Sequence, residues 1–176
     1  NNGDGRFENV TAKVGILAPG PVSEVAAADL DSNIAVDLVV ARGAEPTLVF
    51  NNRRAGRFAL IPEPPGPWPA AKRVLVNDLN NDGHPDTVLI GDREAVILLS
   101  FETQDKGQTA IRQRIDLFLR DHALSGEGSG QASIAVSRAV LMDYDNDGWL
   151  DLCAVGTKRD APDQGTVRLW RNPGGD

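Results

Sequence analysis

The sequence predicts an all-β protein made of about three repeated units of four strands each. Its apolar segments are short and rich in β-branched residues, and turns with glycine, asparagine or proline separate them, which is typical of strands joined by tight reversals. A nine-residue loop with aspartate at both ends and oxygen-bearing side chains between them occurs three times. Together these observations indicate a repeat protein in which each unit carries one such loop.

The composition is that of one soluble globular domain over residues 1–176, with 41% hydrophobic and 24% charged residues. The net charge is −7, and ten of the 25 acidic residues lie in the three loops, so we interpret the charge as metal sites. No basic stripe offsets the repulsion from phosphates, which argues against a nucleic-acid partner. No apolar stretch approaches the ~20 residues that span a membrane, so membrane insertion is not expected.

The composition predicts four strands in the first unit (22–61), four in the second (72–118) and three in the third (132–172). In chain order these strands are Val25–Leu30, Leu38–Ala41, Thr47–Phe50, Arg57–Ile61, Arg73–Leu79, Thr87–Ile90, Ala95–Leu99, Ala110–Leu117, Ile134–Met142, Leu150–Val155 and Val167–Trp170. Counted from the last aspartate of each loop, Phe50, Leu99 and Trp170 occupy equivalent places. Trp170 comes six residues late because the polar loop Thr157–Gly165 precedes it.

Four strands per unit of about 50 residues, joined by short turns, predict the blades of a β-propeller. The third unit lacks a fourth strand, and we expect Arg6–Thr11 (residues 6–11) to supply it and so leave no open sheet edge. Propellers typically have about four to eight blades. Either the chain is a piece of a longer propeller, or two copies associate to close one ring. The first residue is Asn1 rather than methionine, which favours a processed product or an excised fragment.

Two of the loops have the residues of a site for a hard cation. Asp78–Asp86 and Asp143–Asp151 place oxygen-bearing side chains at positions 1, 3, 5 and 9 and glycine at position 6. Calcium takes about six to eight oxygen ligands, whereas magnesium prefers octahedral sites that retain waters. An EF-hand would need flanking helices and an acidic residue at position 12. Strands flank these loops, and position 12 is Val40, Leu89 or Ala154.

The first loop, Asp29–Asp37, is a weaker copy. It offers Asp29, Asp31, Asn33 and Asp37, but Ile34 stands where the other loops have glycine. A β-branched residue is costly at positive φ. We therefore expect this loop to be either reshaped or free of metal.

The chain resembles the FG-GAP or VCBS repeat family, the integrin-α-like β-propellers, and especially the cartilage-acidic-protein-like repeats. The resemblance covers nearly the whole chain apart from Phe101–Gln131, and it lies in Asn1–Phe7, Asp78–Asp86, Asp143–Leu152 and Arg171–Gly175. In that family the loop binds calcium through the side chains at positions 1, 3, 5 and 9 and the main-chain carbonyl at position 7. The ligands that this implies are Asp78, Asn80, Asp82, Asp86 and the carbonyl of His84 in the second loop, and Asp143, Asp145, Asp147, Asp151 and the carbonyl of Trp149 in the third.

The resemblance implies a calcium-binding, non-catalytic module that binds a protein in an extracellular, periplasmic or cell-surface setting. The alternative is a carbohydrate-binding or polysaccharide-lyase-associated propeller, in which Trp68 of the proline-rich linker Pro62–Pro69 would stack on a sugar; the other interpretation of Trp68 is packing over a blade edge. Enzyme activity is not expected, because neither His84 nor His122 belongs to a recognisable catalytic motif.

Overall fold

The computed structural model describes residues 3–61, 68–92, 94–102, 109–118 and 134–174. These residues form eleven strands, which confirms the all-β prediction. Within the described ranges no helix is long and apolar enough to cross a membrane.

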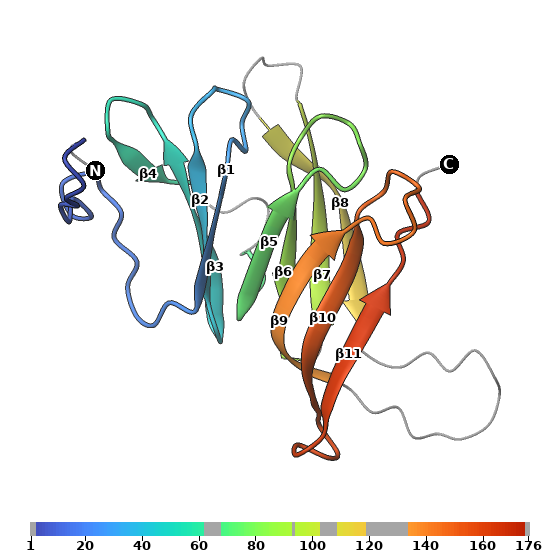
Figure 1. The fold of residues 1–176 in the computed structure, drawn as a ribbon. Helices are drawn as coiled ribbons and strands as arrows, with labels where there is room; N and C mark the ends of the chain where they lie inside the picture. Colours follow the sequence, from blue (N-terminus) through green and yellow to red (C-terminus); the bar gives the residue numbers. More distant parts are fainter. Residues whose placement is uncertain (1–2, 62–67, 93, 103–108, 119–133, 175–176) are drawn as a thin grey trace.

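The strands form three antiparallel sheets that lie side by side (Figure 1). The first sheet contains β1 (Glu24–Ala28), β2 (Asp37–Arg42), β3 (Glu45–Asn52) and β4 (Phe58–Leu60), paired in that order. The second contains β5 (Arg73–Asn77), β6 (Asp86–Ile90), β7 (Glu94–Glu102) and β8 (Thr109–Phe118). The third contains β9 (Ile134–Met142), β10 (Asp151–Lys158) and β11 (Gly165–Trp170), and among the described residues it has no fourth strand, as predicted.

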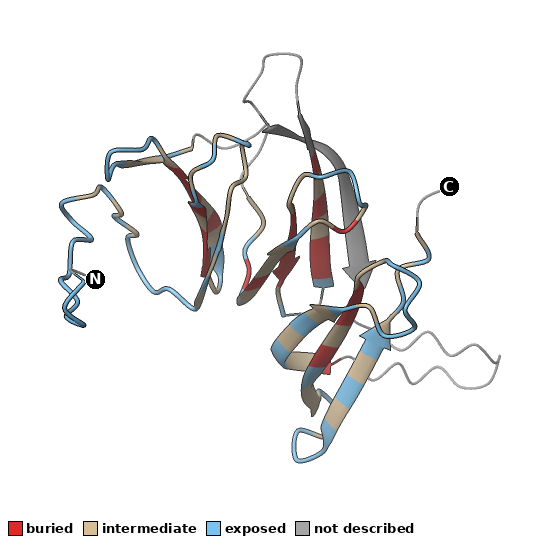
Figure 2. Cartoon of the chain, turned by 45° about the horizontal axis from the view of Figure 1, so that its top comes forward, coloured by how far each residue is buried: buried red, intermediate tan, exposed pale blue. Residues whose placement is uncertain are grey.

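The second sheet lies between the other two and is covered on both faces. One apolar cluster joins the first and second sheets, centred on Val39, Val49 and Leu89, and another joins the second and third sheets through residues that include Ile90 and Leu152. All five residues of β6 are therefore buried, and its last three residues, Val88–Ile90, are a continuous apolar run rather than an alternating one. Figure 2 shows buried residues concentrated in the middle strands of the sheets.

Hydrogen bonds also join the first strands of neighbouring sheets, β1, β5 and β9. The carboxylate of Glu24 accepts the backbone N–H of Val74 at 2.8 Å. The guanidinium of Arg73 donates to the carbonyl oxygen of Ser137 at 2.8 Å. Sheets stacked through their first strands are the arrangement of consecutive propeller blades, although the three described sheets do not close into a ring.

The expectation that Arg6–Thr11 completes the third blade is wrong. These residues form no strand, and the segment that follows lies against the first sheet, where the Val14 carbonyl accepts the N–H of Phe58 at 2.7 Å. The two ends of the chain lie at opposite ends of the array (Figure 1). Because the sheets do not turn through a full ring, the N-terminal residues do not reach β11.

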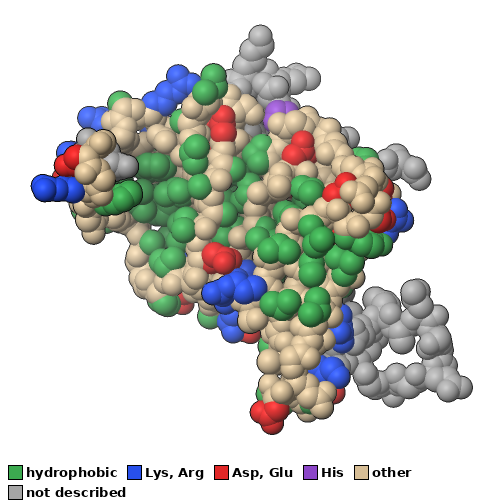
Figure 3. All heavy atoms as spheres, viewed as in Figure 1, with side chains coloured by type: hydrophobic (Ala, Val, Ile, Leu, Met, Phe, Trp, Pro, Cys, Tyr) green, Lys and Arg blue, Asp and Glu red, His purple; other side chains and the backbone are tan. Residues whose placement is uncertain are grey.

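The outer face of the third sheet is apolar and exposed. Val140 and Leu169 lie in register across Cys153, and Val155 is paired with Val167. These four aliphatic side chains are between 40% and 61% exposed. In Figure 3 apolar side chains gather over this sheet. The face is where a further blade would stack if the array continued.

Two details of the third sheet and of the register differ from the predictions. Strand β10 continues to Lys158, through residues expected to belong to a polar loop. Leu98, rather than Leu99, is equivalent to Phe50 and Trp170, because Leu38, Thr87 and Leu152 pair with Phe50, Leu98 and Trp170. The partners lie 12, 11 and 18 residues apart in the three sheets. A bulge between Val40 and Arg42 gives the first sheet one residue more than the second between paired positions. Counting residues from the aspartate therefore selected Leu99 instead of Leu98.

Trp68 is half-buried and packs against the cluster between the first and second sheets. Its indole N–H is buried and makes no hydrogen bond to the described residues. This position supports the packing interpretation. Residues 62–67 of the linker lie outside the described ranges, as do residues 103–108 and 119–133 of the insertion, which include His122.

Gly156 provides a test of how closely β9 and β10 approach. It lies where the register of these strands shifts, and a Cβ there would overlap the carbonyl oxygen of Ala135. We expect Gly156→Ala to lower the free energy of unfolding by about 1–3 kcal/mol, as other overpacked sites do. The matched control is Gly165→Ala, since a Cβ on Gly165 meets nothing within 4 Å. Equal stabilities of the two variants in urea unfolding would contradict the close approach.

Candidate metal centre

The three loops connect the first strand of each sheet to the second. They lie along one edge of the array, the upper edge in Figures 1 and 3, where acidic side chains are visible. All the predicted ligand residues are described by the structure, namely Asp29, Asp31, Asn33, Asp37, Asp78, Asn80, Asp82, His84, Asp86, Asp143, Asp145, Asp147, Trp149 and Asp151.

The aspartate at position 1 holds the turn of its loop. The carboxylates of Asp29, Asp78 and Asp143 each accept the backbone N–H groups of positions 5 and 6, at 2.7–3.2 Å. Positions 4 and 6 have positive φ in every loop. The three loops therefore share one backbone shape. These residues are Ser32 and Ile34, Asn81 and Gly83, and Asn146 and Gly148.

Ile34 adopts the conformation that its side chain disfavours. Its φ is 67°, beside 86° at Gly83 and 89° at Gly148, and its side chain is 91% exposed. The expected reshaping of the first loop does not occur, because the Asp29 carboxylate binds the N–H groups of Asn33 and Ile34 as its counterparts do in the other loops. The side chain avoids collision by pointing into solvent, and the backbone strain remains.

The aspartate at position 9 is a hub that joins three parts of its blade. Asp37, Asp86 and Asp151 are fully buried. One carboxylate oxygen of each accepts the N–H of position 2, from Leu30, Leu79 or Tyr144, at 2.8–3.1 Å. The other accepts an N–H at the end of the third strand or just after it, from Asn52, Ser100 or Asn172, at 2.7–2.8 Å.

Sequence reasoning identified the aspartates of these hubs but missed the third-strand donors. The donors are two residues beyond Phe50, Leu98 and Trp170, so the strand register locates them. The donors are two asparagines and a serine, and they follow their aspartates by 15, 14 and 21 residues in the sequence, which left no motif. The one hint in the sequence is that Asn51-Asn52 and Arg171-Asn172 both end in asparagine, at the equivalent donor position.

Burial raises the pKa of Asp37 and of Asp86 above the ordinary value of 3.8. Desolvation is the largest cause; the backbone N–H donors oppose it in part, and the neighbouring loop aspartates add to it by repulsion. Without a cation, the ionised form of these carboxyl groups is thus less favoured in the folded protein than in water.

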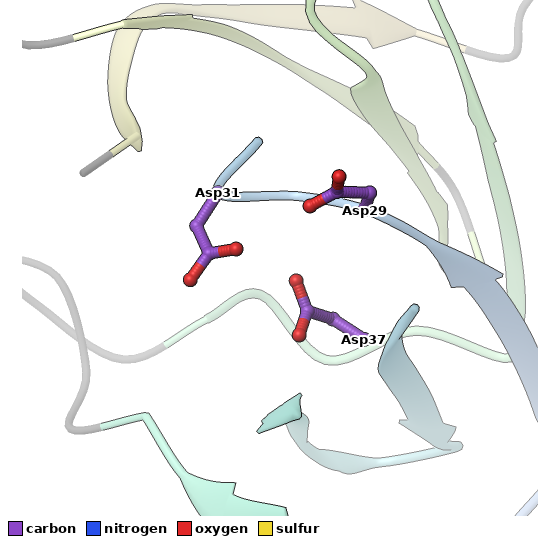
Figure 4. A group of neighbouring side chains, drawn as sticks. All are labelled: Asp29, Asp31 and Asp37. Atoms are coloured by element: carbon purple, nitrogen blue, oxygen red, sulfur yellow. The ribbon is translucent and has the colours of Figure 1, made fainter. Parts of the chain in front are cut away.

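The first loop brings three carboxylates into an arrangement that could bind a metal ion. Asp29, Asp31 and Asp37 each offer an oxygen within 4.8 Å of the others, and Figure 4 shows the three side chains converging. The amide of Asn51 donates to Asp31 at 2.6 Å and to Asp37 at 3.2 Å. Three side-chain oxygens of this group are buried without a hydrogen-bond partner: Asp31 Oδ1, Asn33 Oδ1 and Asn51 Oδ1.

In the second loop, the three aspartates do not converge to the same extent, and among the described residues they form no such group. The Asn80 amide donates to Asp82 Oδ2 at 3.0 Å, and the backbone N–H of His84 donates to Asp82 Oδ1 at 2.9 Å. The sequence favoured this loop over the first, whereas the geometry favours the first.

The third loop gathers its carboxylates around a guanidinium. Asp143, Asp145 and Asp151 offer oxygens within 4.8 Å of one another. Asp147 lies outside this group, and its oxygens accept the N–H of Trp149 at 2.9 Å and the guanidinium of Arg171 at 2.7 Å. Arg171 also donates to Asp145 at 2.8 Å.

Hydrogen bonds connect each loop to the next. The hydroxyl of Ser32 lies 3.4 Å from the His84 ring, the amide of Asn81 donates to the carbonyl of Gly148 at 3.0 Å, and that of Asn172 donates to the carbonyl of Leu79 at 2.9 Å. The three loops therefore form one continuous row.

The strain at Ile34 predicts a stabilising glycine. Ile34→Gly should raise the free energy of unfolding by about 0.5–1 kcal/mol, because relief of the left-handed conformation, about 1–2 kcal/mol, exceeds the backbone entropy cost of glycine. Val36→Gly is the matched control, since Val36 is an exposed residue of the same loop without positive φ. It should destabilise. A loss of stability in Ile34→Gly, measured by urea unfolding, would contradict the shared loop shape.

The hydrogen bonds of Asp86 predict that its replacement strongly lowers the stability of the protein even without metal. Asp86→Ala leaves the buried N–H groups of Leu79 and Ser100 without an acceptor and should cost about 2–4 kcal/mol in chelator. Asp82→Ala removes a carboxylate from the exposed side of the same loop and should cost under about 1 kcal/mol there. Thermal melts of both variants in chelator give the comparison, and equal losses would argue against the hub.

Comparisons with known proteins do not identify the chain. No protein-family model matches it, and no curated protein matches its sequence. The resemblance to FG-GAP or VCBS repeats therefore rests on the residues quoted above. The structure supports the all-β blades and two acidic groups able to hold a metal ion.

Proposed function

We propose that the chain is a calcium-stabilised β-propeller segment that serves as a non-catalytic protein-interaction module outside the cytosol. The observation that carries this proposal is the set of buried oxygens in the first loop that lack a donor. A buried acceptor without a partner costs about 1–3 kcal/mol. A cation would satisfy Asp31 Oδ1 and Asn33 Oδ1 without requiring any further N–H or O–H group.

The donor set favours calcium over other metals. Every side chain in the first loop group offers oxygen, and neither histidine nor cysteine belongs to the two acidic groups. Oxygen-only sites suit hard cations rather than zinc or copper. Calcium tolerates an irregular arrangement of about six to eight ligands, which suits a loop whose carboxylates are also bound to backbone N–H groups.

When bound, calcium would supply positive charge where three carboxylates of one loop converge. The residues of the chain then have two tasks. The aspartates at positions 1 and 9 fix the backbone of the loop and join it to the third strand. In the first loop, Asp31 and Asn33 at positions 3 and 5 supply buried oxygens that lack a donor. Since the unfolded chain has no such preformed site, binding would add to the free energy of folding.

The same contacts support the non-catalytic part of the proposal. The aspartates at positions 1 and 9 already accept backbone N–H groups, so they are structural acceptors rather than free acids or bases. The extracellular setting follows from the family resemblance and from the millimolar calcium available there. Because Trp68 packs against the core, we do not propose the carbohydrate-binding alternative.

Calcium should raise the melting temperature of the protein, relative to the same protein in chelator at equal ionic strength. A ligand at about 100 times its Kd stabilises by about 2.7 kcal/mol. Magnesium should give a much smaller shift. Asp31→Ala should reduce the calcium-dependent shift, because it removes a ligand of the first loop without removing a hub. No calcium-dependent shift in the unmodified protein would contradict the proposal.

The matched control for Asp31→Ala is Glu45→Ala. Glu45 is an exposed acidic residue at the β2–β3 turn, at the far end of the same sheet from the loop. The two variants lose the same charge, so a difference between their calcium responses reports on the site rather than on the net charge.

A further inference from the structure

In each sheet, the backbone N–H that binds the position-9 aspartate comes from the third strand or just after it. The residue immediately before that donor occupies an equivalent place in the three sheets. By strand register these residues are Asn51, Leu99 and Arg171, each one position beyond the partner of the second strand. They are equivalent in the backbone but differ completely in chemistry: one is a neutral amide, one is apolar and one is a cation.

Arg171 binds two carboxylates of the third loop at once. Its Nε lies 2.8 Å from Asp145 Oδ2 and its Nη2 lies 2.7 Å from Asp147 Oδ2. These distances are those of charge-assisted hydrogen bonds. A guanidinium is charged at physiological pH, and the hydrogen bonds to Asp145 and Asp147 raise the pKa of Arg171 further. The Arg171 side chain is 53% exposed, whereas each aspartate side chain is 26% exposed.

The other loops have no such cation on their carboxylates within the part of the chain that the structure describes. Asn51 donates its amide to Asp31 and Asp37 but brings no charge. Leu99 has no donor. Arg54 lies beside the first loop, but its guanidinium donates to the main-chain carbonyl of Asn33 rather than to a carboxylate.

We propose that Arg171 is a built-in cation that replaces part of the calcium requirement of the third loop and competes with calcium there. This inference rests on the proposed function, and it implies that the three loops differ in how much they depend on calcium. The third loop keeps its carboxylates together without metal, whereas the first loop has buried oxygens that still lack a partner.

The competition follows from the ligand positions. Asp145 and Asp147 occupy positions 3 and 5 of the loop, so calcium would bind carboxylates that Arg171 already contacts through one oxygen each. A divalent cation and a guanidinium on the same carboxylates repel each other. Because Arg171 is half-exposed, it has room to swing into solvent when calcium enters, and the loss of its two hydrogen bonds weakens the binding of calcium.

The test replaces Arg171 by leucine, the residue that the second loop has at the equivalent place. Terbium is the probe, because this trivalent ion occupies calcium sites and its emission is sensitised by a nearby tryptophan; Trp149 belongs to the third loop. Titration of calcium against bound terbium then reports calcium affinity at that loop. Trp149→Phe in the unmodified background should abolish the signal and so confirms its origin.

We expect two results from Arg171→Leu. The melting temperature in chelator should fall, because Asp145 and Asp147 then repel each other without a counter-charge. The calcium affinity of the third loop should rise at least about tenfold, the effect of removing one unit charge beside a divalent ion at surface screening. In Arg171→Lys, which keeps the charge but loses the contact with two carboxylates at once, the calcium affinity of the third loop should rise less. Arg171→Lys also serves as the folded variant if the leucine variant unfolds in chelator.

The charge control is Arg159→Leu. Arg159 lies in the β10–β11 turn, at the opposite end of the third sheet, and pairs with Asp92 at 3.6 Å. This variant should leave the terbium signal and calcium affinity unchanged.

Unchanged or weaker calcium affinity in Arg171→Leu would overturn the inference while leaving the proposed function intact. Absence of calcium and terbium binding in the unmodified protein would instead overturn the proposed function and this inference with it.

Discussion

The buried aspartate at position 9 is the interaction on which each blade depends. A carboxylate removed from water is costly unless hydrogen bonds compensate it. Two backbone N–H groups do so here, one from the loop and one from the end of the third strand or just after it. The loop, the second strand and the third strand are thereby fixed relative to one another. The positions of the other carboxylates follow from that arrangement, since the loop has no regular secondary structure of its own.

Much of the fold could be predicted from local sequence. Short β-branched segments located all eleven strands to within a few residues, and the spacing of aspartate and glycine located the loops. The hub donors could not be found in this way, because their contribution comes from the backbone and their register depends on a bulge and on hairpin length. The contact between Arg171 and the third loop was hidden for the same reason.

Two predictions failed because they treated a local preference as decisive. Ile34 disfavours positive φ, yet hydrogen bonds from Asn33 and Ile34 to Asp29 hold the backbone there. The loop with the least regular sequence is one of the two whose carboxylates converge. Residues 6–11 have the composition of a strand, but pairing with β11 would require both ends of the chain to meet. That meeting depends on the global curvature of the array rather than on any residue in the segment.

The number of residues between paired positions of the second and third strands differs among the sheets, and this has a consequence for how such a chain can vary. The partners lie 12, 11 and 18 residues apart, yet the hub contacts in the three sheets have the same geometry. A hairpin that lengthens does so at its turn, away from the loops, and leaves the distance from aspartate to third strand unchanged. The edge of the array that carries the acidic loops thus has a fixed geometry, whereas the turns at the opposite edge can accept inserted residues. A peptide grafted between Arg159 and Gln164 would be displayed without disturbing the acidic loops.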